Sequence, residues 1–177
     1  EHIVPIPWGD SAINKDWKVH NRWKILHACP FDEAVILDTD MLVVSDISKQ
    51  CDYMKNYEIF YTNSILDYRG NTVSSDFYRK NYTKYNLPNL YCGFSYFKKS
   101  EFSYSFYDML GTVSENWEEC YKINGSLIQK HLSMDTTVSL VTRMLDCEQR
   151  VTASAKQMHK PTFVHMKPNI QGWNRLS

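Results

Sequence analysis

The chain has 177 residues, a length typical of one domain with a single core, and its 20 basic and 20 acidic residues leave no net charge at pH 7. A balanced charge gives no overall field that would attract nucleic acid or an anionic membrane surface, and no apolar run reaches the ~18–20 residues of a membrane span. The five cysteines are irregularly spaced without a C-x-x-C pair, which excludes a zinc finger, argues against a disulfide framework and predicts a reducing, cytoplasmic location.

We expect residues 1–177 to form one domain, and because the chain has no initiator Met we expect it to be a piece of a longer protein. Residues 1–16 are predicted to be extended, since they hold two of the six prolines and Gly9. From Asp16 to Cys29 apolar residues recur at loosely helical spacing, and Pro30 ends this predicted helix.

The stretch Asp38-Thr39-Asp40 follows the apolar run Ala34–Leu37 and precedes another, Met41–Val44. These runs predict a buried strand, in which residues two apart project to the same side. Two carboxylates placed together repel each other unless a positive group lies between them, and a divalent cation with oxygen ligands is the usual solution. The alternative is that the strand ends at Leu37 and the aspartates cap a loop.

The remaining elements alternate between strands and helices. We predict a short helical turn at 46–48, a strand at 57–61, a long irregular insertion at 62–88, a strand at 90–97 with Gly93 marking a close backbone approach, helices at 101–121 and 135–145, and a final strand at 162–166. This alternation predicts an α/β fold with a mixed, mostly parallel sheet flanked by helices.

The segment Ile36–Val43 closely resembles the D-x-D motif of nucleotide-sugar glycosyltransferases with the GT-A fold, a Rossmann-like architecture. The pattern is similar to that of the retaining glycogenin-like and bacterial galactosyltransferase-like enzymes. In those families a basic helical residue precedes D-x-D, and a strand with a glycine turn, a helix opened by Asp, and a late His with Lys follow it. Here that order is Arg22 or Lys24, Asp38 and Asp40, Cys92-Gly93, Asp135, then His165 with Lys167.

The resemblance implies a metal-dependent transfer of sugar from a nucleotide-diphosphate donor, a UDP-sugar, to a carbohydrate or protein acceptor. It implies that Asp38, Asp40 and His165 hold the cation, and an imidazole ligand favours Mn²⁺ over Mg²⁺. The residues that it implies as donor contacts are Arg22, Lys24, Thr39, Gly93, Lys167 and Gly172.

Two further carboxylates, Asp135 and Asp67, are candidate catalytic residues. Asp135 opens a predicted helix, so a favourable interaction with the helix dipole explains it equally well. Asp67 lies in the tyrosine-rich insertion, where it contacts the donor sugar or pairs with Arg69 on the surface.

The sequence departs from the family pattern in three places. The first strand of the family, which holds the nucleotide base, has no counterpart. Tyr91-Cys92-Gly93 replaces the usual Asn-Ser-Gly, and the spaced motif with the late His is compressed to His165-Met166-Lys167-Pro168. Two other functions stay open: a haloacid-dehalogenase-like phosphatase, whose D-x-D supplies a nucleophile and an acid, and a transferase-like domain that binds carbohydrate without turnover.

Overall fold

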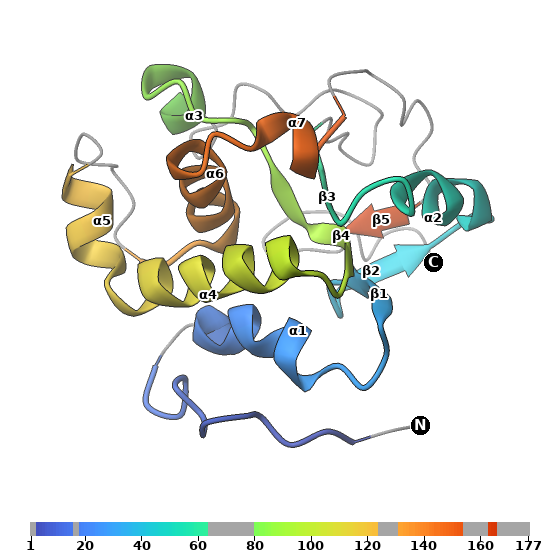
Figure 1. The fold of residues 1–177 in the computed structure, drawn as a ribbon, viewed down its shortest axis with the longest axis horizontal. Helices are drawn as coiled ribbons and strands as arrows, with labels where there is room; N and C mark the ends of the chain where they lie inside the picture. Colours follow the sequence, from blue (N-terminus) through green and yellow to red (C-terminus); the bar gives the residue numbers. More distant parts are fainter. Residues whose placement is uncertain (1–2, 16–17, 64–79, 124–130, 154–162, 166–177) are drawn as a thin grey trace, which may run out of the picture.

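Strand β4 (Tyr91–Lys98) lies at the centre of a three-stranded sheet in the computed structural model, between β1 (Glu33–Leu37) and β3 (Ile59–Thr62) (Figure 1). Both neighbours run antiparallel to β4. The structure describes residues 3–15, 18–63, 80–123, 131–153 and 163–165. A second, two-stranded antiparallel sheet joins β2 (Met41–Val43) to β5 (Phe163–His165).

Strand β4 is central because its sequence is apolar on both faces, and all of its residues except Lys98 are buried. Phe94 and Tyr96 pack on one face with Phe60 and Met54. Phe97 packs on the other face with a larger cluster that includes residues of the long helices. Residues that alternate along a strand point to opposite faces, so a strand with few polar residues must be covered on both sides.

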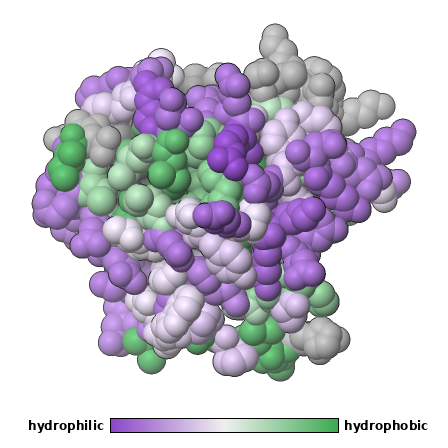
Figure 2. Space-filling model, viewed as in Figure 1, coloured by the Kyte–Doolittle hydropathy of each residue, from purple (hydrophilic) through white to green (hydrophobic). Residues whose placement is uncertain are grey.

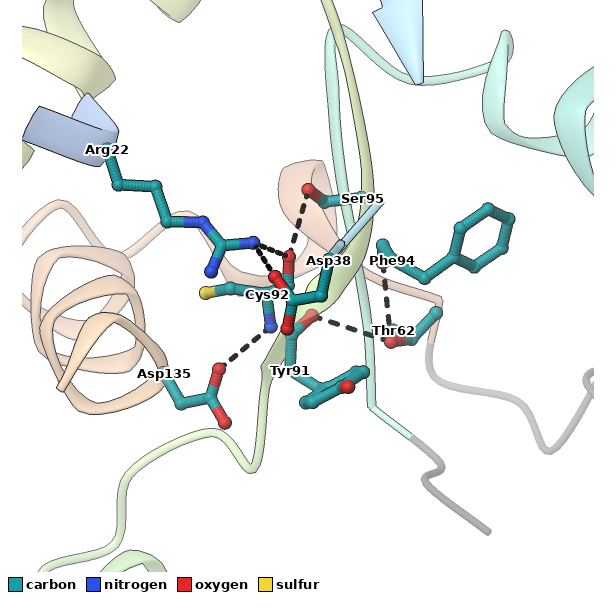
Figure 3. A network of polar contacts seen from close by, with 8 residues as sticks. All are labelled: Arg22, Asp38, Thr62, Tyr91, Cys92, Phe94, Ser95 and Asp135. Carbon is teal, nitrogen blue, oxygen red and sulfur yellow. Dashed lines mark hydrogen bonds and ion pairs between the residues drawn. The ribbon is translucent and has the colours of Figure 1, made fainter. Parts of the chain in front are cut away.

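The helices pack around this sheet. They are a 3₁₀ helix η1 (Lys18–Lys24), α1 (Ile25–Ala28), α2 (Ser48–Met54), α3 (Lys80–Lys84), α4 (Glu101–Glu115), α5 (Trp117–Ile123), α6 (Met134–Met144) and α7 (Glu148–Val151). Helix α4 begins with a capping box between Ser100 and Ser103, and its buried face contacts η1 on one side and α6 on the other (Figure 1). This packing brings the end of η1 and the start of α6 toward the first residues of β4 (Figure 3).

The α/β class expected from the sequence is confirmed, and the strands lie close to their predicted positions. The pairings observed between the strands that the structure describes are antiparallel, so the mostly parallel sheet stays a prediction. Two local expectations were wrong. Strand β1 is half-buried rather than buried, because it pairs with β4 alone at the edge of the described sheet. The apolar runs before and after Asp38-Thr39-Asp40 do not form one strand, because the backbone turns between Asp38 and Met41.

The surface in the view of Figure 2 is hydrophilic over most of its area, with hydrophobic residues gathered over α5 and α6 and around the N-terminal segment. In that segment Ile3 and Trp8 are among the most exposed large apolar side chains. Within the residues that the structure describes, none of the helices has both the length and the apolar character needed to cross a membrane.

Candidate functional site

Arg22, in the last turns of η1, reaches the turn that follows β1. Its Nη2 atom contacts Asp38 Oδ1 and also donates a hydrogen bond of 3.0 Å to the carbonyl oxygen of Cys92 (Figure 3). The Arg22 and Asp38 side chains are 26% and 20% exposed, so this ion pair is partly shielded from water. A guanidinium held between a carboxylate and a carbonyl is fixed in position before any ligand arrives.

The first residues of β4 connect this ion pair to α6. The amide of Asp38 donates to the carbonyl of Gly93 at 2.9 Å. The amide of Cys92 donates to Asp135 Oδ1, in the first turn of α6, at 2.8 Å (Figure 3). Two consecutive residues of β4, Cys92 and Gly93, therefore bond to three residues that are far apart in the sequence. Cys92 bonds to Arg22 and Asp135, and Gly93 bonds to Asp38.

Tyr91 places its side chain along the strand and over Gly93. A methyl group built on Gly93 would lie 2.2 Å from Tyr91 Oη, so the phenol occupies the space that any other residue's Cβ would need. Burial, followed by the negative charges of Asp38, Asp135 and Asp40, raises the pKa of Tyr91 far above its usual value. Three carboxylates therefore act on one phenol, and that phenol stays protonated.

Two further groups of the site, the Cys92 thiol and the Arg22 guanidinium, have shifted pKa values. Burial raises the pKa of the Cys92 thiol well above its usual value, and the charge of Asp135 adds to the effect. Burial would lower the pKa of Arg22, but the acidic groups around it, Asp38 and Asp135 among them, outweigh it and the net shift is upward. Cys92 is thus a neutral thiol rather than a nucleophile, and Arg22 is a permanent cation.

The two-stranded sheet brings the backbone of His165, the third expected metal ligand, close to the Asp38–Asp40 turn. Met41, directly after Asp40, is the register partner of His165 on β5. The backbone of His165 therefore lies beside the Asp38–Asp40 turn, while its side chain is not among the described ones. Asp38 and Asp40 themselves are half-buried.

A divalent cation fits this site by donor chemistry, because carboxylate oxygens are the ligands that Mn²⁺ and Mg²⁺ prefer. Among the described side chains, no group of three His, Cys, Asp or Glu residues is arranged to hold a metal ion. A complete ligand set therefore needs a donor beyond those side chains, and His165 is the candidate that the backbone places nearby.

Of the remaining expected site residues, Thr39 belongs to the Asp38–Asp40 turn, Lys24 lies elsewhere and three fall outside the described residues. Lys24 is 3% exposed, and its Nζ donates to the Gly9 carbonyl at 2.6 Å and to Ser11 Oγ at 2.9 Å, so it holds the N-terminal segment. Thr39 is exposed at the tip of the turn. Asp67, Lys167 and Gly172 lie outside the described residues.

Sequence reasoning overlooked two members of the site, the Cys92 carbonyl and the Tyr91 phenol. A carbonyl has no sequence signal of its own. Tyr91 had one: it lies two residues before Gly93, and residues two apart in a strand share a face, so the glycine leaves room for that ring.

Comparison of this chain with family models, with curated proteins and with solved structures found no match.

Proposed function

We propose that the protein is a metal-dependent glycosyltransferase of the GT-A type, which transfers a sugar from a nucleotide-diphosphate donor, a UDP-sugar, to a carbohydrate or protein acceptor. The observation that carries the proposal is the convergence of Arg22, Asp38 and Asp135 on Cys92-Gly93. These residues represent four of the five features in the motif order. Residues from distant parts of the chain are thus joined by direct contacts at one end of β4.

The chemistry of such a transfer explains why these residue types are needed together. A nucleotide diphosphate develops negative charge as the bond to the sugar breaks, and positive groups fixed in advance stabilise that charge. Asp38 and Asp40, with His165, would hold the divalent cation that supplies part of this charge. Arg22 supplies a second positive charge, and its contact with Cys92 fixes where that charge lies.

The other site residues have supporting roles in this proposal. Asp135 faces the same part of β4 and is the carboxylate best placed to orient the reacting sugar, with Asp67 as the second candidate. Gly93 has no side chain, so it leaves room for the Tyr91 ring, and its carbonyl accepts from the Asp38 amide. Lys167, Gly172 and Thr39 remain candidate donor contacts, and Lys24 is not required. Because all five cysteines are free thiols, we place the activity in the cytoplasm.

The phosphatase alternative is less well supported. A phosphatase of that class attacks with the first Asp of D-x-D, and that carboxylate must be an available nucleophile. Asp38 instead contacts the Arg22 guanidinium, which draws electron density from the carboxylate and restricts its movement.

The test is to incubate the full-length protein with UDP-sugars and measure release of UDP with Mn²⁺, with Mg²⁺ and with EDTA. We expect Mn²⁺-dependent release that EDTA abolishes and that Asp38→Asn reduces at least ~10²-fold. Release of phosphate from phosphomonoesters with Mg²⁺ would support the phosphatase instead. If the protein binds UDP but turns over none of the common UDP-sugars, it is a binding domain without catalytic activity.

A further inference from the structure

Strand β4 leaves its regular pairing with β3 at the residues that form the candidate site. Tyr61 is the register partner of Ser95, but the next residue of β3, Thr62, pairs with Tyr91. Residues 92–94 of β4 therefore have no register partner on β3, and we call them the β4 bulge. On its other side β4 keeps a regular register with every residue of β1. Bulges of this kind re-aim the groups of a strand, and they are common beside active sites.

The bulge makes the backbone of Cys92 available to the site. In a regular ladder the amide and carbonyl of a residue bond to a neighbouring strand. Cys92 instead uses its amide for Asp135 and its carbonyl for Arg22 (Figure 3). The hydroxyl of Ser95 lies 3.5 Å from the same carbonyl oxygen. One residue of a central strand thus holds two side chains of the candidate site because the ladder is broken there.

Thr62 connects the two ends of this bulge. Its hydroxyl lies 3.4 Å from the carbonyl oxygen of Tyr91, just before the bulge, and 3.5 Å from that of Phe94, at its end (Figure 3). A hydroxyl has one proton, so the two carbonyls share it. Thr62 is 5% exposed, so water has little access to these contacts. The hydroxyl therefore limits how far the backbone between the two carbonyls can move.

We propose that Thr62 is a positioning residue of the candidate site, which fixes the backbone of Cys92 by spanning the bulge. Arg22 and Asp135 are bonded to that backbone, so their positions depend on it. This inference rests on the proposed function, in which Arg22 contacts the nucleotide diphosphate. Groups that are fixed before the ligand arrives lose less entropy when it binds, so binding is tighter.

Thr62→Val removes the hydroxyl and keeps a side chain of similar shape. We expect UDP, at saturating Mn²⁺, to bind about fivefold more weakly than to the wild type, because Arg22 is less well fixed. Thr62→Ser keeps a hydroxyl and should bind UDP within about twofold of the wild type. Thr62→Ala removes the hydroxyl without placing a methyl group against the two carbonyls, so it replaces the Val variant if that variant does not fold.

A double-mutant cycle with Arg22→Met separates positioning from a general loss of stability. A threonine that only stabilises the fold would affect UDP binding by the same factor with or without Arg22. We expect Thr62→Val to change UDP affinity by less than about twofold when Arg22 is already Met, because the hydroxyl acts through the guanidinium. UDP carries no transferable sugar, so the proposed role of Asp135 does not enter this measurement.

Thr152→Val is the matched control. Thr152 is 4% exposed, and its hydroxyl donates at 2.7 Å to the carbonyl of Tyr61, the residue before Thr62. This bond is shorter than either contact of Thr62, and it does not involve the β4 bulge. Thr152→Val should therefore lower the melting temperature at least as much as Thr62→Val, while UDP affinity stays within about twofold of the wild type.

The experiment measures binding of UDP at saturating MnCl₂ by isothermal titration calorimetry, with the melting temperature of each variant. Weaker binding to Thr62→Val that is restored in Thr62→Ser, absent from Thr152→Val and lost in the Arg22→Met background supports the inference. Unchanged UDP affinity in Thr62→Val and Thr62→Ala, or an equal loss with and without Arg22, overturns it and leaves the proposed function standing. If the wild type does not bind UDP with Mn²⁺, the proposed function fails and the inference fails with it.

Discussion

Asp135 accepts a hydrogen bond of 2.8 Å from the backbone amide of Cys92, and this bond ties the first turn of α6 to the central strand of the sheet. The same carboxylate benefits from the partial positive charge at the start of an eleven-residue helix. These two interactions are enough to explain why an aspartate occupies position 135. A catalytic role is tested by variants that remove its charge but keep its hydrogen bond to Cys92.

The comparison of Asp135→Asn with Asp135→Ala makes that separation. Asn retains an oxygen that can accept from the Cys92 amide, whereas Ala leaves that amide without its partner. We expect Ala to lower the free energy of unfolding by about 1–3 kcal/mol and Asn to lower it by less than about 1 kcal/mol, measured by urea denaturation. If Asn also removes UDP-sugar turnover, the charge itself is required. Full turnover in Asp135→Asn would assign Asp135 a structural role alone.

Neutralising Asp40 should remove metal-dependent activity without harming the fold. Asp40→Asn keeps the shape and one oxygen but loses the charge that attracts the cation. Since Asp40 shares a turn with a second carboxylate, that of Asp38, its neutralisation should relieve repulsion, so the melting temperature without metal should be unchanged or slightly higher. We expect at least tenfold weaker binding of Mn²⁺ in the presence of UDP, measured by calorimetry.

Asp46→Asn is the control for Asp40. Asp46 is exposed, and its carboxylate accepts hydrogen bonds from the amide and hydroxyl of Ser48 at the start of α2. The Ser48 hydrogen bonds lower the pKa of Asp46. This variant should lose a little stability and bind Mn²⁺ normally. A fall in melting temperature for metal-free Asp40→Asn, like that of the control, would show that Asp40 is a structural residue.

Arg22 and Lys24 provide a matched pair for the contact with the donor. Arg22→Met should weaken binding of UDP, at saturating Mn²⁺, by about tenfold, because a fixed cation beside Asp38 is lost. Lys24→Met should leave UDP affinity within about twofold of the wild type, because its ammonium is bound to Gly9 and Ser11.

The expected signature of Lys24→Met is faster amide hydrogen exchange in residues 8–12, where the N-terminal segment loses its anchor. Arg22→Met should not change exchange in that segment. Weaker UDP binding in Lys24→Met than in Arg22→Met would reverse the assignment of the two side chains.

The order of elements could be predicted from sequence because most of them have a strong pattern. The run 90–97 has the continuous apolar composition of a covered strand, and β4 is buried along nearly its whole length. The apolar spacing of 101–121 identified α4 and α5, although the break between them at Asn116 has no strong signal. Pairing direction was harder, since it depends on which strands meet in space rather than on local pattern.

The site could be predicted in part. Arg22, Asp38, Gly93 and Asp135 were chosen from the sequence and are joined in the structure. The sequence could not separate Arg22 from Lys24. Residues two apart on a helix project in different directions, and which of them faces β4 depends on how η1 packs in the fold.

The turn at Asp38–Asp40 and the position of Tyr91 were also beyond sequence reasoning. The apolar runs on each side of Asp38-Thr39-Asp40 favour a continuous strand, whereas the Met41 amide donates to the Asp38 carbonyl and the backbone turns. The Tyr91 ring lies over Gly93, in space that only a glycine leaves open. Such positions follow from tertiary packing, which no local pattern specifies.

Buried tyrosines give the protein a predictable sensitivity to alkali. Burial raises the pKa of Tyr121 to about 12, and its hydroxyl donates to the Ser133 carbonyl at 3.0 Å. A group whose pKa is raised by folding stabilises the protein fully below its unfolded pKa of about 10, and that stabilisation is lost as the pH rises through the folded value.

We therefore expect the free energy of unfolding to decrease between about pH 10 and pH 12, with Tyr121 contributing about 1.4 kcal/mol per pH unit. Tyr121→Phe removes this titration, so its stability should fall less steeply over the same range even though it starts lower from the loss of a hydrogen bond. The measurement is urea denaturation of both proteins at several alkaline pH values, with tyrosinate absorbance recorded in parallel. Parallel stability curves for the two proteins would mean that the Tyr121 hydroxyl ionises as readily in the folded chain as in the unfolded one.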